Sequence, residues 1–329
     1  MSRKLKLLLL SFACLGAGMS GTSLRAQEQQ KTLWAVSVGP EYTALGGDYD
    51  SLFLWSRKEA KPDLRIPVAG TITNLQWHPN GKTLVISTQW GLKEHGKGVM
   101  AFNPQTMDFQ ILEGISETGA RAIDWSPAGE LLAVGDNEGL LFIYDQNFNL
   151  IKKVDTGLRS ITGIGWHPTK RIVTYVSGKI GSYNLDTEEL QVWKSRPEDM
   201  LLLSVDWHPS GDFFAISDYG DNYQNYPAQV QFHQPNGSLI KAMQGSTAEY
   251  RNIQWTQDGS QLATTSDAFR LWTQKGELIT ELAFENLLWG LDYDHWNEEW
   301  VVTDVVGQVH KVTKDGKRVL ESVRPFGRD

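Results

Sequence analysis

The sequence predicts an all-β fold, a seven-bladed β-propeller in which each blade is a sheet of four antiparallel strands. A short motif, a tryptophan followed by a tight turn, recurs as WHPNG at Trp77, WSPAG at Trp125 and WHPSG at Trp207. Around each copy lie short segments rich in β-forming residues. A motif that recurs along the chain in this way is typical of repeat architectures, in which each unit buries its faces against its neighbours.

Aligning the chain on the repeated tryptophan gives seven units, whose aligned positions lie 38 to 48 residues apart. These positions are Val38, Trp77, Trp125, Trp166, Trp207, Trp255 and Tyr293. Seven units predict one closed ring that spans residues 27–329 as a single domain. We expect the aligned aromatic residue to pack between neighbouring sheets, where its burial contributes roughly 2–3 kcal/mol.

Each unit predicts its four strands in the same order. The residues before the aligned position form the first strand, as in LLSVDW, and a turn such as HPSG leads to the second, FFAIS. The third strand ends near an aromatic residue, as in LLFIY, and the fourth is more polar, as in LIKKVD. Two ways of closing the ring remain open. Either the first strand begins at Thr32 without exchange, or EQQKTL adds a short outer strand to the last unit.

These repeats resemble the WD-repeat β-propeller family from Thr32 to about Val323. The best copy is WSPAGELLAVGDNEGLLFIYD, which begins at Trp125. The repeats are degenerate: the opening Gly-His pair is missing, and the closing Trp-Asp pair survives only in altered forms such as Tyr144-Asp145. A related group of periplasmic propellers with SPDG-type repeats is the alternative. The resemblance implies that second-to-third and fourth-to-first connections share one face, called the top.

Residues 1–26 are typical of an export signal. A basic MSRKLK is followed by the apolar LLLLSFACLGAGM and a small-residue exit, SLRA, before Gln27. We expect cleavage after Ala26 and a periplasmic or extracellular protein of the bacterial exported type. Lipid anchoring at Cys14 is a weaker alternative because the bulky Phe12 lies close to the cleavage point. A buried N-terminal helix is a third interpretation.

Composition excludes several classes of site and partner. Cys14 is the only cysteine, so no disulfide framework or cysteine-ligated metal is possible. After cleavage, 27 basic and 39 acidic residues leave a formal net charge of −12, which argues against nucleic acid or an anionic membrane as partner. The apolar run is short for a membrane span. We expect a monomer without a cofactor.

Two units have long second-to-third connections, which the propeller topology places on the top face. The first connection, Thr88 to Gly98, contains Trp90. The second, Asp218 to Ala228, is acidic and aromatic, and its candidate partner-contact residues are Asp218, Tyr219, Asp221, Tyr223 and Tyr226. Binding residues concentrate in loops on rigid scaffolds, and tyrosines suit interfaces. The alternatives are a solvated loop or a cation site that uses Asp218, Asp221 and Asn222.

A second set of candidates lies four residues before each aligned position, where the inner strand begins at the top mouth of the channel. This set comprises Trp34, Thr73, Arg121, Thr162, Leu203, Arg251 and Trp289. We expect Trp34, Arg121, Arg251 and Trp289 to bind an anionic or carboxylate-bearing ligand between guanidinium groups and indole rings. Alternatively, the tryptophans pack between sheets and the arginines pair with acids such as Asp124 or Glu249. The histidines His78, His167 and His208 are interpreted as turn residues.

The sequence contains no nucleophile elbow, zinc-protease motif, phosphate-binding glycine loop or haem attachment motif. The first functional hypothesis is therefore an exported, non-catalytic scaffold. It would bind a protein, peptide or glycan through its top face and channel mouth. The alternative is a lactonase- or hydrolase-type propeller enzyme with a metal ion over the channel. That enzyme would need several carboxylates converging on the axis, which the predicted mouth residues do not supply.

Overall fold

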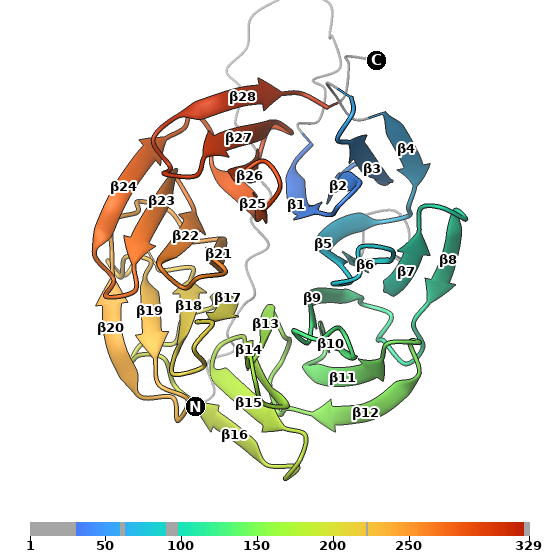
Figure 1. The fold of residues 1–329 in the computed structure, drawn as a ribbon. Helices are drawn as coiled ribbons and strands as arrows, with labels where there is room; N and C mark the ends of the chain where they lie inside the picture. Colours follow the sequence, from blue (N-terminus) through green and yellow to red (C-terminus); the bar gives the residue numbers. More distant parts are fainter. Residues whose placement is uncertain (1–30, 60–62, 90–97, 222, 326–329) are drawn as a thin grey trace, which may run out of the picture.

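The computed structural model describes residues 31–59, 63–89, 98–221 and 223–325. Within these ranges, seven four-stranded antiparallel sheets surround a central axis, as Figure 1 shows. This confirms the predicted seven-bladed propeller. The expected signal segment, Cys14 and Trp90 lie outside the described residues. The described part of the chain contains no helix with the length and apolar character needed to cross a bilayer.

The first four blades follow one another along the chain. Blade 1 comprises β1 (Leu33–Val38), β2 (Tyr42–Gly47), β3 (Ser51–Ser56) and β4 (Leu64–Pro67). Blade 2 comprises β5 (Thr71–Trp77), β6 (Leu84–Gln89), β7 (Val99–Asn103) and β8 (Asp108–Ile111). Blade 3 comprises β9 (Ala120–Trp125), β10 (Leu131–Asp136), β11 (Leu140–Asp145) and β12 (Leu150–Asp155). Blade 4 comprises β13 (Gly163–Trp166), β14 (Ile172–Val176), β15 (Ile180–Asn184) and β16 (Leu190–Trp193).

The last three blades complete the ring. Blade 5 comprises β17 (Leu202–Trp207), β18 (Phe214–Asp218), β19 (Val230–His233) and β20 (Leu239–Met243). Blade 6 comprises β21 (Asn252–Trp255), β22 (Gln261–Thr265), β23 (Ala268–Thr273) and β24 (Leu278–Ala283). Blade 7 comprises β25 (Leu288–Asp294), β26 (Glu299–Asp304), β27 (Val309–Thr313) and β28 (Val319–Val323).

The ring closes without strand exchange among the described residues. The first sheet has the order β1-β2-β3-β4 and the last has the order β25-β26-β27-β28, so each blade comes from one continuous stretch of chain. The described residues thus match the first of the two expected closures, and residues 28–30, which the alternative would use, lie outside them. Across the seam, the Thr303 hydroxyl donates to the Leu33 carbonyl at 2.9 Å. The carboxylate of Asp292 accepts the Val38 amide at 2.7 Å.

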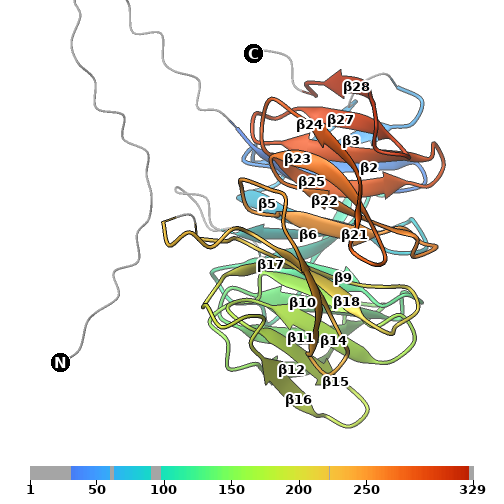
Figure 2. The same cartoon turned by 90° about the vertical axis from the view of Figure 1, so that its left-hand side faces the viewer.

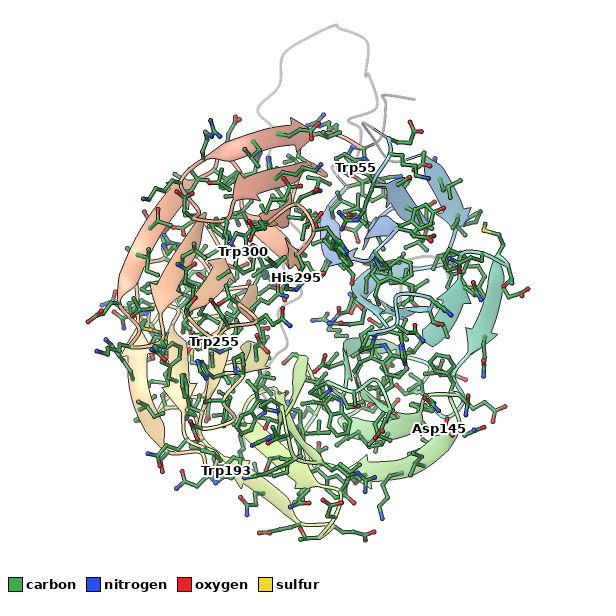
Figure 3. The ribbon with its side chains drawn as sticks, in the orientation of Figure 1. Trp55, Asp145, Trp193, Trp255, His295 and Trp300 are labelled. Carbon is green, nitrogen blue, oxygen red and sulfur yellow. The ribbon has the colours of Figure 1, made fainter. Side chains whose placement is uncertain are left out.

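The aligned aromatic residues lie between blades, as predicted. The six aligned aromatic residues are all at most 9% exposed, and Figure 3 shows Trp255 inside the ring of sheets. Several indoles also bond to the preceding blade: Trp77 Nε1 donates to the Ser37 carbonyl at 3.2 Å, and Trp166 Nε1 donates to the Asp124 carbonyl at 3.0 Å. The wedge is therefore both an apolar filler and a hydrogen-bonded link.

The histidine after the wedge does more than shape its own turn. The ring of His78 lies edge-on to Trp125 of the next blade, with centroids 4.4 Å apart. Its Nε2 is 2.9 Å from the Gly129 carbonyl in that blade's turn. Gly129 has φ of 73°, and a Cβ there would lie 2.8 Å from the His78 ring. The motif glycine therefore provides both the left-handed backbone and the space for the histidine.

The two faces of the ring differ in their connections. First-to-second turns form the bottom face. One of them joins β25 to β26 and contains His295, which lies beside the central opening in Figure 3. Second-to-third and fourth-to-first connections form the top face. Figure 2 shows the ring edge-on, with the gold connection between β18 and β19 extending from its left-hand side. This extension is the long loop predicted in unit five.

Candidate functional site

A central channel runs along the axis, with a volume of about 450 Å³. Residues from the inner strands of all seven blades line it, including Trp34, Thr73, Thr162 and Leu203 from the predicted mouth set. Strand alternation explains this placement, because equivalent positions of seven equivalent strands point the same way. Four of the seven mouth residues therefore line the channel, and Arg121, Arg251 and Trp289 lie outside its lining.

Three members of the mouth set, Trp34, Trp289 and Arg251, form a stack near the top of the channel. The rings of Trp34 and Trp289 meet edge to face, with centroids 4.1 Å apart and planes at 80°. The guanidinium carbon of Arg251 lies 4.2 Å from the Trp289 ring centroid and 5.3 Å from that of Tyr219. Three of the four predicted ligand-binding residues thus touch, and the unit-five loop adds Tyr219. Ligand binding by this stack remains a prediction.

The two arginines of the mouth have different partners among the described residues. Arg251 forms an ion pair with Glu249, as one of the sequence alternatives expected. Arg121, from the opposite side of the ring, donates through Nε to the side chain of Gln89 at 2.7 Å. Burial, and then the nearby charge of Arg251, lower the pKa of Arg121. The expected pairing of an arginine with Asp124 is not found among the described contacts, because that carboxylate bonds elsewhere.

The threonines of the mouth set join blades. The Thr73 hydroxyl donates to the Ala120 carbonyl at 2.8 Å, and the Thr162 hydroxyl donates to the Leu202 carbonyl at 2.6 Å. Each of these bonds reaches the next blade. The two threonines therefore have structural partners already, which leaves the arginines and tryptophans as the binding candidates.

The long connection of blade 5 is a small hairpin, which we call the tyrosine hairpin (Tyr219–Gln229). Asp221 and Tyr226 exchange two backbone hydrogen bonds, of 2.7 and 2.9 Å. Tyr223 at its tip is 95% exposed and Tyr219 is 46% exposed, whereas Tyr226 is half-buried. The hairpin thus presents two tyrosines to solvent on the top face, next to the Arg251 stack.

The expectation that Asp218 contacts a partner is wrong, because its side chain is fully buried. Its carboxylate accepts the amides of Gly220 at 3.0 Å and Gln229 at 2.9 Å, which fixes both ends of the tyrosine hairpin. The buried Arg196 lies 3.6 Å from the same carboxylate and donates to the Pro227 carbonyl at 3.2 Å. Burial raises the pKa of Asp218. Asp218 therefore holds the hairpin in place.

Other blades show why Asp218 has this role. Asp136 and Asp304 also end a second strand, and each accepts two amides of the turn that follows. In the sequence, this turn aspartate appears at the end of LLAVGD, FFAISD and EWVVTD. This pattern could have identified Asp218 as a turn aspartate and distinguished it from the exposed residues that follow it. Asn222, the third member of the cation-site alternative, lies outside the described residues.

Three carboxylates on the channel wall were not among the predicted site residues. Asp124, Asp206 and Asp292 directly precede the aligned aromatic residues of blades 3, 5 and 7, in IDW, VDW and LDY. Each accepts the backbone amide of the aligned residue in the next blade, namely Trp166 at 3.0 Å, Trp255 at 2.7 Å and Val38 at 2.7 Å. The recurrence of Asp before an aromatic residue in alternate units was the available signal.

Burial changes the ionisation of these wall carboxylates. It raises the pKa of Asp124 to about 8 and that of Asp206 to about 7, and it also raises the pKa of Asp292. The amide hydrogen bonds act in the opposite direction but are weaker. In the described part of the chain, no three His, Cys, Asp or Glu side chains are grouped so that they could hold a metal ion.

Comparison with known proteins gives a weak match to one group. No protein-family model matches the chain. It is similar to echinoderm microtubule-associated protein-like 2 from Rattus norvegicus and Mus musculus, with 24% identity over 154 residues. The Homo sapiens protein is 24% identical over 153 residues. Each alignment covers 46% of this chain and 21% of the relative, so the chain spans only part of these proteins. The similarity and the seven-bladed architecture support a WD-repeat type of propeller.

Proposed function

We propose that this protein is an exported, non-catalytic propeller scaffold that binds a protein, peptide or glycan through its top face. The observation that carries the proposal is the position of Arg251, between Trp289 of the channel mouth and Tyr219 of the tyrosine hairpin. This contact joins the two sets of candidates into one surface. Export rests on the composition of residues 1–26.

The chemistry of this surface suits recognition. Arginine, tryptophan and tyrosine are the residues that dominate the energy of protein interfaces. Tyr223 is almost fully exposed, and the buried Asp218 holds the base of its hairpin. Rigid aromatic side chains on a fixed loop lose little conformational entropy when they bind. The relatives are microtubule-associated proteins by name, which is consistent with a role in binding other proteins.

The proposal is tested by capture of partners from an envelope extract. The Arg121→Glu/Arg251→Glu variant is expected to lose partners that the wild-type protein retains, with an unchanged circular dichroism spectrum. The matched control is Arg171→Glu, because Arg171 is an exposed arginine paired with Asp186 away from the mouth. This control is expected to capture the same partners as wild type. Equal capture by all three proteins would contradict binding at the mouth.

The enzyme alternative would have to use the three wall carboxylates, which in the described part of the chain are not grouped closely enough to hold a metal ion. A metal ion over the channel would have to compete with the backbone amides that Asp124, Asp206 and Asp292 already accept. Under the scaffold proposal, elemental analysis of the purified protein finds no stoichiometric calcium or zinc. One equivalent of bound metal that is lost in the Asp206→Asn variant would favour the enzyme alternative.

A further inference from the structure

Among the described residues, the channel mouth holds the guanidinium groups of Arg121 and Arg251, which come from blades 3 and 6. Glu249 pairs with Arg251, and the two side chains are only 16% and 20% exposed. A second carboxylate, that of Asp48, accepts the indole N–H of Trp34 at 3.0 Å. The Glu249 pair shows that a carboxylate fits against the guanidinium of Arg251 at this partly dehydrated site.

Two buried hydrogen-bond donors lie beside this ion pair. The Nε–H of Arg251 and the Nε1–H of Trp289 are both buried without an acceptor among the described residues. Unpaired buried donors are rare in folded proteins, because burial removes their hydrogen bonds to water. These two donors point to a ligand that supplies an acceptor at this position.

We propose that the channel mouth recognises a carboxylate group on its ligand, and that Glu249 occupies the same position in the free protein. The inference rests on the proposed function in placing the ligand at the mouth, and it adds the chemistry of recognition. A ligand carboxylate would displace that of Glu249 from Arg251 and come within the field of Arg121. The edge-to-face indoles of Trp34 and Trp289 offer an apolar contact beside it.

Two ligand pairs test the carboxylate and its source. N-acetyl-phenylalanine is compared with its amide, and glucuronate with glucose, by calorimetric titration and by the shift in melting temperature. The carboxylate member of at least one pair is expected to bind, and its affinity is expected to fall as salt is raised. Binding of N-acetyl-phenylalanine alone identifies a peptide-type source, and binding of glucuronate alone identifies an acidic sugar. Equal behaviour of acid and neutral members in both pairs would overturn the proposal.

Single variants separate recognition from structure. Glu249→Gln removes the internal competitor, and it is expected to bind the carboxylate probe several-fold more tightly than wild type. Arg251→Gln is expected to weaken binding at least tenfold, and Arg171→Gln to leave it unchanged. Arg121→Gln, on the other side of the ring, is the second loss variant should Arg251→Gln fold poorly. Weaker binding in Glu249→Gln would contradict the competitor role.

The two proposals can fail separately. If the probes bind through Arg251 while partner capture survives in Arg121→Glu/Arg251→Glu, carboxylate recognition stands and the proposed function at the mouth fails. If partner capture depends on these arginines but no carboxylate binds, only the present inference is overturned.

Discussion

Arg57 and Asp294 form a two-pronged ion pair between the first and last blades. Nη1 lies 2.9 Å from Oδ2, and Nη2 lies 3.0 Å from Oδ1. Arg57 also donates to the Gly39 carbonyl, and the ring of Trp296 lies 4.3 Å from its guanidinium carbon. The Asp294 side chain is 5% exposed and that of Arg57 is 19% exposed. This pair lies at the bottom of the seam, where the described residues of the two blades meet without strand exchange.

We expect Arg57→Ala to lower the free energy of unfolding by about 2–3 kcal/mol, because it leaves a buried carboxylate without its countercharge. Chemical denaturation measures the effect. Arg171→Ala is the matched control, because it removes an ion pair of similar length, 3.0 Å, whose side chains are more than half exposed. That control is expected to change stability by less than about 1 kcal/mol. Equal losses in both variants would show that the seam does not depend on this pair.

The wall carboxylates predict a dependence of stability on pH. The folded protein holds the Asp124 proton up to about pH 8, whereas the unfolded chain releases it near the ordinary value of 3.8. The folded state therefore binds more protons between these values, and this group makes stability fall as pH rises. Asp124→Asn keeps an acceptor for the Trp166 amide and cannot ionise. The difference between its melting temperature and that of wild type is expected to increase by a few degrees from pH 5 to pH 8. A difference in melting temperature that stays constant over this range would contradict the raised pKa of Asp124.

Deleting the tip of the tyrosine hairpin and removing the Asp218 side chain at its base are expected to affect stability to very different degrees. Removing Asp221–Tyr226 is expected to leave the melting temperature nearly unchanged, because Tyr223 at the tip is exposed and the Asp218 carboxylate bonds to Gly220 and Gln229, which are kept. Asp218→Ala is expected to cost about 2–4 kcal/mol, since it leaves two amides and the buried Arg196 without their acceptor. Thermal unfolding of the two variants makes the comparison. A collapse of the deletion variant would assign the hairpin a structural role.

The fold could be predicted from the sequence because every unit repeats the same local chemistry. The wedge Trp125, its turn and the four short strands around it specify one blade, and seven copies specify a ring. Closure without strand exchange could not be predicted, because the sequence pattern was compatible with both of the expected closures. The contacts that decide it, such as Arg57 with Asp294, join residues from opposite ends of the chain.

The site was predicted in part. Equal positions in the repeat placed Trp34, Arg251 and Trp289 at one mouth, and the structure brings them into contact. Asp218 was misassigned because a turn aspartate and an exposed loop aspartate look alike when neighbours in space are unknown. The wall carboxylate Asp124 was considered only as an arginine partner, because its observed partner, the Trp166 amide, belongs to the next blade. In both cases the deciding information is tertiary burial.

The central claim, that partners bind at the top face, is tested most directly by photocrosslinking at matched positions on the two faces. Tyr219 on the top and Trp296 on the bottom are each about half exposed, at 46% and 55%, and each lies against an arginine. Benzoylphenylalanine placed at Tyr219 is expected to capture the partner, and the same group placed at Trp296 is expected to capture none. Crosslinks from Trp296 and none from Tyr219 would contradict the account.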